Sequence, residues 1–151
     1  DLMFFIGHWL SHKVPFLYKL HKVHHEYINS VAIAGQWNHP IDDLLGNLIP
    51  TISPILLFDN HMVTWNLYII LRMIDSAEGH GGYTVPTLYK YIWDPARKHA
   101  YHHSVNTGMY STLGYLDWIF GTEGKSFRKW YAERQENGTI HHVKQFATKS
   151  D

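Results

Sequence analysis

Three short histidine clusters constrain the fold of this chain more than any other feature of its sequence. Residues 8–12 have the spacing HxxxH, and residues 21–25 and 99–103 both have the spacing HxxHH. Side chains three or four positions apart project from the same side of an α-helix. Each cluster therefore predicts a helix that presents two or three imidazoles to one point, as rigid elements do when they hold a metal ion. We expect an all-α fold built around these helices.

The number of clustered imidazoles indicates two metal ions. Histidine is as abundant as either class of charged residue, with 13 His, 13 Lys+Arg and 13 Asp+Glu. A zinc ion usually takes three or four protein ligands, so eight imidazoles exceed the needs of one ion. The chain has no cysteine, and thiolate sites are therefore excluded. The eight predicted ligands are His8, His12, His21, His24, His25, His99, His102 and His103.

The remaining histidines have different predicted roles. His80 lies in a glycine-rich segment after an apolar stretch, where the chain returns to the other clusters, and we expect it to be a ninth ligand; the alternative is a loop histidine. We expect His39 to contact a metal-binding histidine rather than the metal ion itself. Three other histidines are expected to face solvent, namely His61, His141 and His142. Three carboxylates are candidates to accept the second ring N–H of a ligand, or are surface charges or helix caps. They are Glu26, Asp42 and Asp117.

Two apolar runs in the middle of the chain predict a helical hairpin over about residues 41–74. They cover residues 44–58 and 62–74, separated by a short polar turn. Each run is shorter than the roughly 20 residues that cross a bilayer, although flanking residues could extend both. We expect a short membrane hairpin beneath a polar helical cap; the alternative is a buried helical pair in a soluble bundle. The mean hydropathy of -0.26 is low for a membrane protein.

Length and charge narrow the class of protein further. The 151 residues, 45% of them hydrophobic, are expected to form a single domain over 1–151, with a polar tail over 122–151. The formal net charge is +0 and the isoelectric point is about 7.4. A protein that binds nucleic acid through its phosphates normally carries a basic surface. We therefore expect no nucleic-acid partner.

Four sequence stretches resemble the fatty acid hydroxylase and sterol desaturase superfamily, and most closely the sterol C-4 methyl oxidases, also called methylsterol monooxygenases. The resemblance covers roughly residues 4–122. It is carried by LYKLHKVHHEY at 17–27, HPID at 39–42, HGGY at 80–83 followed by Pro86, and LDWIFGT at 116–122. Two positions depart from the methyl oxidase pattern: Asp42 stands where a Glu is usual, and Met109 precedes Tyr110 where an Asn is usual.

The resemblance implies a fold, a location and a reaction. Family members have transmembrane helices topped by a cytosolic helical cap in the endoplasmic reticulum membrane, so we expect this chain to lack N-terminal membrane helices or to be a compact variant. Two iron ions, held by the nine predicted ligands, would use O2 and an electron donor such as cytochrome b5 and its reductase. They would oxidise a lipid C–H bond, above all in a sterol 4-methyl group. Imidazole also suits zinc. Tyr83, Tyr91, Trp93 and Trp118 would line the substrate approach, or form an interfacial aromatic belt.

Other functions remain open from the sequence. The same fold could act on fatty acyl, carotenoid or aldehyde substrates as a hydroxylase or desaturase. A structural or accessory subunit of a membrane complex could keep the fold and the metals without turnover. A zinc-stabilised helical bundle is the third alternative. The oligomeric state, the reductase and the oxidised carbon are not specified by any motif.

Overall fold

The described part of the chain folds entirely into helices. The computed structural model describes residues 1–27, 31–82, 94–124 and 126–136, and within them there is no β-strand, which confirms the all-α prediction. The elements are α1 (Leu2–Lys13), α2 (Pro15–His21), η1 (His24–Glu26), η2 (Ala32–Gln36), α3 (Pro40–Asp43), η3 (Leu44–Leu48), α4 (Ile49–Leu57), α5 (Met62–His80), α6 (Pro95–Val105), α7 (Tyr115–Ile119) and α8 (Phe127–Glu136).

Prolines and a histidine cap set several of the helix boundaries. Pro15 begins α2 after Val14, whose extended backbone ends α1. Pro40 and Pro95 likewise stand at the first position of α3 and α6. The exposed imidazole of His61 accepts a hydrogen bond from the backbone N–H of Val63 and so caps α5.

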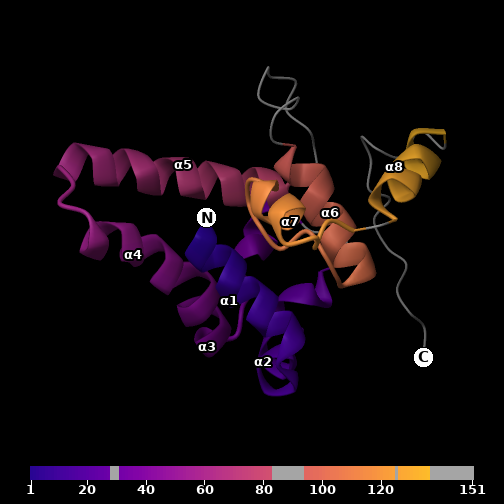
Figure 1. Cartoon of the computed structure of the whole chain (residues 1–151), viewed down its shortest axis with the longest axis horizontal. Helices are drawn as coiled ribbons and strands as arrows, with labels where there is room; N and C mark the ends of the chain where they lie inside the picture. The colour runs from indigo at the N-terminus through magenta and orange to yellow at the C-terminus, as the bar shows by residue number, and fades with distance from the viewer. Residues whose placement is uncertain (28–30, 83–93, 125, 137–151) are drawn as a thin grey trace.

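The predicted hairpin is present as two helical arms. The continuous helical stretch from α3 through η3 to α4 forms one arm and α5 forms the other, and both extend away from the rest of the molecule (Figure 1). Many apolar side chains at its far end are exposed, including Leu56, Leu57, Phe58 and Met62. In the described residues, no helix combines the length and the hydropathy that a membrane crossing requires. The membrane hairpin therefore stays a prediction.

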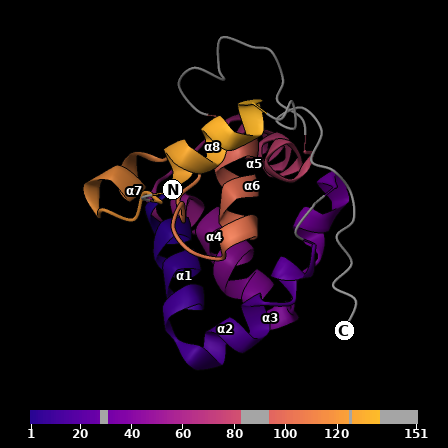
Figure 2. The ribbon, with the colours of Figure 1, turned by 90° about the vertical axis from the view of Figure 1, so that its right-hand side faces the viewer.

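The end of the hairpin opposite its turn meets the other helices. There α1 packs on α2 and η3, and α5 packs on α6 and η2. Viewed from this end, α1 and α6 run side by side with α2 and α3 beneath them (Figure 2). Part of the predicted polar tail forms α8, which packs on α6 through ring contacts of Tyr101 with Phe127 and Trp130.

The interior contains as many histidines as apolar side chains. Seven buried residues of the described chain are hydrophobic and seven are histidines, and Phe5, Tyr110 and Leu116 form its only cluster of buried apolar residues in that part. Buried neutral polar groups are costly unless they are paired or hold a metal. The position of the histidines is therefore the feature of the fold that needs explanation.

We predict that Gly7→Ala destabilises the protein. A Cβ atom at Gly7 would lie 2.8 Å from the backbone oxygen of Leu45, so α1 would have to move away from η3. The expected loss in the free energy of unfolding is roughly 1–3 kcal/mol, measured by denaturant unfolding. Gly46→Ala is the matched control, because a Cβ atom added there would meet nothing within 4 Å. Equal stability of the two variants would contradict the packing of α1 on η3.

Candidate metal centre

The nine histidines predicted as ligands come together in two adjacent groups. We call them the five-histidine group and the four-histidine group. Within each group the candidate ligand nitrogens all lie within 4.8 Å of one another. The five-histidine group comprises His8, His12, His21, His25 and His102, and the four-histidine group comprises His24, His80, His99 and His103. The two groups are in contact, since the ring centroids of His25 and His103 are 4.4 Å apart.

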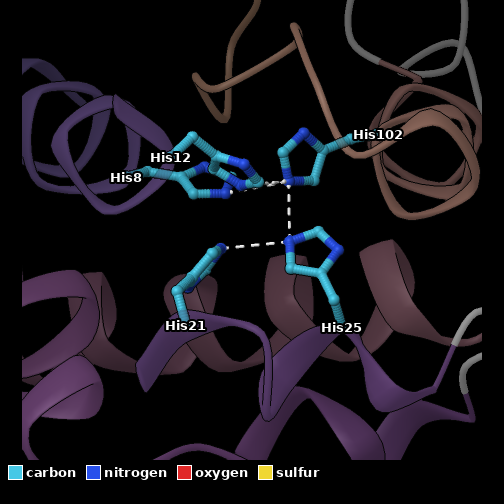
Figure 3. Close-up of side chains that lie close together, drawn as sticks. All are labelled: His8, His12, His21, His25 and His102. Atoms are coloured by element: carbon cyan, nitrogen blue, oxygen red, sulfur yellow. Dashed lines mark hydrogen bonds between the residues drawn. The ribbon is translucent and has the colours of Figure 1, made fainter. Parts of the chain in front are cut away.

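Each HxxHH cluster contributes to both groups. On α6, His99 and His103 are one helical turn apart and enter the four-histidine group, whereas His102 faces the five-histidine group. In the other cluster His24 enters the four-histidine group, while His21 and His25 enter the other. The α1 pair His8 and His12 completes the five-histidine group (Figure 3). Two candidate ion sites are thus built from shared sequence motifs.

The outer ring nitrogens of several of these histidines are anchored. Nδ1 of His8 lies 2.8 Å from the carbonyl oxygen of Tyr110, and Nδ1 of His102 lies 2.6 Å from that of Gly108. Nδ1 of His21 lies 2.9 Å from a carboxylate oxygen of Asp42. Because these partners only accept hydrogen bonds, Nδ1 carries the proton and donates it in each case. In the neutral imidazole the inner nitrogen, Nε2, then has a free lone pair.

The Nε2 atoms of these histidines face one another, and their lone pairs would repel without a cation between them. Nε2 of His8 and Nε2 of His102 are 3.0 Å apart, and both carry lone pairs in the neutral tautomers just assigned. Two acceptors cannot share a hydrogen bond. Nε2 of His102 also lies 3.1 Å from that of His12 and 3.2 Å from that of His25. A positive ion among these nitrogens would turn the repulsion into coordination.

The spacing of the nitrogens suits coordination to one ion. An imidazole nitrogen binds a metal such as zinc at about 2.1 Å, so two ligands at a right angle are about 3.0 Å apart. In the four-histidine group, Nε2 of His80 lies 3.2 Å from that of His24 and 2.8 Å from that of His99. Nε2 of His99 and His103 are 2.9 Å apart. Both groups therefore fit a metal ion, and the chemistry of the donor set suits iron, zinc or copper.

Burial keeps these imidazoles in the neutral form that binds metals. Desolvation, together with the charges of neighbouring histidines, lowers the pKa of His12 and His103 to about 3 and that of His24 to about 2. The same causes lower the pKa of His8 and His102 well below the usual value. At neutral pH these ring nitrogens are therefore free of the proton that would compete with a metal.

Two of the predicted supporting carboxylates are buried beside the site. Asp42 accepts the Nδ1–H of His21 and lies 3.4 Å from the hydroxyl of Ser11, which is the arrangement expected for a carboxylate that orients a ligand. Asp117 is fully buried, but it has no hydrogen bond to a histidine among the described residues. It accepts hydrogen bonds from backbone and hydroxyl groups instead, including the N–H of Tyr110 and that of Ser111.

The other predicted supporting residues lie elsewhere. Glu26 is exposed and accepts the indole N–H of Trp37, and His39 caps α3 through the N–H of Ile41; within the described residues, neither has a hydrogen bond to one of the nine histidines. Trp118 is 73% exposed on α7 and does not line the cavity beside the histidines, because the helix presents Leu116 and Asp117 to the interior instead. Tyr83, Tyr91 and Trp93 lie outside the described residues.

Backbone carbonyls are the supporting groups that sequence reasoning missed. The carbonyl oxygens of Gly108, Tyr110 and Ser76 accept the Nδ1–H groups of His102, His8 and His80. No residue type marks a carbonyl acceptor in a sequence. For His80 alone there was a signal, because Ser76 precedes it by four positions on a helix.

One cavity gives access to both groups. His8 and His21 of the five-histidine group line it, as do His24, His80 and His99 of the four-histidine group. Its other walls include the apolar side chains of Phe4, Met109 and Tyr110 and the cations of Arg72 and Lys98. A reactant in this cavity would reach both ions, and the apolar wall favours a substrate with hydrocarbon groups.

Comparison with known proteins places the chain in an enzyme family. The model of the fatty acid hydroxylase family matches residues 1–122, and the chain belongs to this family. It is 34% identical to methylsterol monooxygenase 2-2 of Arabidopsis thaliana, over 93% of the chain and 54% of the relative. It is 32% identical to a very-long-chain aldehyde decarbonylase of Oryza sativa, over 93% and 54% respectively.

A further relative is named for a third type of lipid substrate. A fatty acid hydroxylase of Mycosarcoma maydis is 35% identical over 88% of the chain and 33% of the relative. The chain spans about half the length of the methylsterol monooxygenase and aldehyde decarbonylase relatives that it matches. No solved structure matches it significantly. The names of these relatives differ in their substrates, which are a methylsterol, a very-long-chain aldehyde and a fatty acid.

We predict that the purified chain binds about two metal ions and that removing two ligands of one group leaves about one. The double variant His80→Ala/His99→Ala retains only two imidazoles in the four-histidine group, too few to hold an ion. Metal content measured by mass spectrometry after dialysis checks this result. His61→Ala is the control, since His61 is exposed at the hairpin turn. A double variant that still holds two ions would contradict the division into two groups.

Proposed function

We propose that the chain uses O2 and two iron ions to oxidise a C–H bond of a membrane lipid, and that a sterol 4-methyl group is the preferred target. The single observation that carries the proposal is the meeting of nine imidazoles in two adjacent groups that open onto one cavity. A structural metal site is closed and needs about four ligands. An accessory subunit would need neither the second group nor the cavity.

The two groups differ in a way that suits oxygen chemistry. When bound, the irons would supply a site for O2 and the means to pass electrons to it. The five-histidine group offers one ligand more than the four-histidine group, so an ion in the latter has more room for a further ligand. The four-histidine group also contributes three of its members to the cavity wall, which are His24, His80 and His99.

The protein's own residues orient the ligands and shape the substrate space. Asp42 and the carbonyls of Gly108, Tyr110 and Ser76 fix the ring planes of His21, His102, His8 and His80, so these four histidines need little reorganisation when an ion binds. Phe4, Met109 and Tyr110 offer the apolar contacts that hold a hydrocarbon against the centre. For one hydroxylation the balance is RH + O2 + 2 electrons + 2 H⁺ → ROH + H2O, and an electron donor such as cytochrome b5 with its reductase would supply the electrons.

The choice of a sterol rests on the similarity to methylsterol monooxygenase. The aldehyde decarbonylase and fatty acid hydroxylase relatives support a second candidate, an enzyme that acts on an aldehyde or a fatty acyl chain. The histidine groups serve either reaction. Substrate choice therefore depends on the cavity rather than on the metal ligands.

Activity can be tested with the iron-loaded chain, cytochrome b5, its reductase, NADH and O2. We expect a 4-methylsterol to be oxidised at its methyl group, with the double variant His80→Ala/His99→Ala slower by at least about a hundredfold and His61→Ala unchanged. Product analysis by mass spectrometry is the measurement. Turnover of an aldehyde or fatty acyl lipid alone would replace the sterol proposal. Tight binding of two irons without turnover of any lipid would favour an accessory subunit.

We further propose that the hairpin inserts into the endoplasmic reticulum membrane, with the histidine groups on its cytosolic side. The support is the exposed apolar surface at the far end of the hairpin, where Leu56 is 80% and Leu57 is 70% exposed. Such a surface favours transfer into lipid. We expect the double variant Leu56→Glu/Leu57→Glu to float with phosphatidylcholine vesicles at least about tenfold less than the unmodified chain. Equal flotation of the two proteins would refute insertion through this surface.

A further inference from the structure

Asp117 is buried on α7 beside the loop that contains Gly108 and Tyr110. Its side chain has no exposed surface. Oδ1 accepts the N–H of Tyr110 at 2.8 Å and the hydroxyl of Thr122 at 2.6 Å, and Oδ2 accepts the N–H of Ser111 at 2.8 Å. The hydroxyl of Ser111 also donates to Oδ2. One carboxylate thus holds two successive N–H groups of this loop.

The peptide group between Tyr110 and Ser111 connects Asp117 to a predicted metal ligand. Its N–H, which belongs to Ser111, donates to the carboxylate of Asp117. Its C=O, which belongs to Tyr110, accepts the Nδ1–H of His8 at 2.8 Å. A carboxylate that accepts from the N–H of an amide increases the negative charge on the oxygen of the same amide. The oxygen then accepts more strongly from His8, which raises the basicity of Nε2.

A second peptide group of the loop, between Gly108 and Met109, is held in a parallel way. The carbonyl of Gly108 accepts the Nδ1–H of His102 at 2.6 Å. The N–H of the same peptide belongs to Met109 and donates to the carbonyl oxygen of Thr122 at 3.1 Å. Thr122 is fixed in turn by Asp117, through its hydroxyl and through its N–H, which donates to the carbonyl of Asp117 at 2.8 Å. The carbonyls of Gly108 and Tyr110 are therefore both held in place by hydrogen bonds that lead to Asp117.

The loop does not adopt this shape without cost. Met109 has φ 55°, a left-handed conformation that is unfavourable for a residue with a side chain, and it is nevertheless buried. Strain of this kind persists where surrounding contacts over-determine the backbone. The hydrogen bonds to Asp117 begin at the residue immediately after Met109. They are the interactions best placed to hold the strained residue.

We propose that Asp117 is a positioning residue for the five-histidine group, acting on His8 and His102 through two peptide groups rather than by direct contact. The inference deepens the proposed function and rests on it, because it assumes that this group holds an ion. Asp42 binds His21 directly, so the group would have one carboxylate in contact with a ligand and a second that acts through the backbone.

The test measures Zn²⁺ affinity in the His80→Ala/His99→Ala background, where only the five-histidine group can hold an ion. We expect Asp117→Asn to weaken Zn²⁺ binding by about tenfold, because an amide nitrogen replaces one of the two accepting oxygens. Isothermal titration calorimetry with a competing chelator gives the dissociation constant. An unchanged constant for a folded Asp117→Asn variant would overturn the inference.

If Asp117→Asn does not fold, two variants that each remove a single side-chain hydroxyl test the same inference. Ser111→Ala removes a donor from the loop, and we expect binding about threefold weaker. Ser53→Ala is the matched control, since it also removes one serine hydroxyl, which donates to the carbonyl of Pro50 in α4 and not to Asp117, and we expect no change in affinity. Equal effects of the two variants would indicate general stabilisation and refute a positioning role. Absence of Zn²⁺ binding before any change at Asp117 would instead refute the metal centre itself.

Discussion

The packing of the helices brings unprotonated imidazole nitrogens together, and the lone pairs of these nitrogens repel one another unless a cation lies between them. The outer nitrogens of His8 and His102 donate to carbonyl oxygens, so their inner nitrogens face each other as two acceptors at 3.0 Å. In most proteins the core gains stability from hydrocarbon contacts, and a buried polar atom is tolerated when it finds a donor. A cation at the shared point would remove this conflict. Coordination would then hold these helices together alongside hydrophobic packing.

This constraint accounts for the small apolar core. Only a few side chains, such as Phe5, Tyr110 and Leu116, are packed as a buried hydrocarbon cluster in the described part of the chain. Many of the larger apolar residues lie outside, on the hairpin and on α7. A domain with so little buried hydrocarbon gains stability from a bound metal because binding favours the folded state. We therefore regard the metal centre as part of the fold as well as of the chemistry.

The sequence predicted which histidines come together better than it predicted their surroundings. Helical spacing and residue type single out His8, His12 and the two HxxHH clusters. Residues 21–25 nevertheless run from the end of α2 into η1, and each HxxHH cluster divides between the two groups instead of meeting at one point. The division into groups of five and four was not predictable, since it depends on how α1, α5 and α6 pack. Glu26 and His39 show the same limit, because a polar residue close to a ligand in sequence can serve as a surface contact or a cap. The sequence predicted the helical hairpin, and the insertion of this hairpin into a membrane stays a prediction.

His24 and His25 are joined by one peptide bond but belong to different groups. The short 3₁₀ turn η1 directs their rings to opposite sides, with ring planes at 85° to each other. The first ion to bind would order this turn and so also position the ligand of the second ion. The conformational entropy of the turn is then lost only once for two binding events. Loading of the two ions would then be cooperative, and a half-loaded centre would be the least populated form.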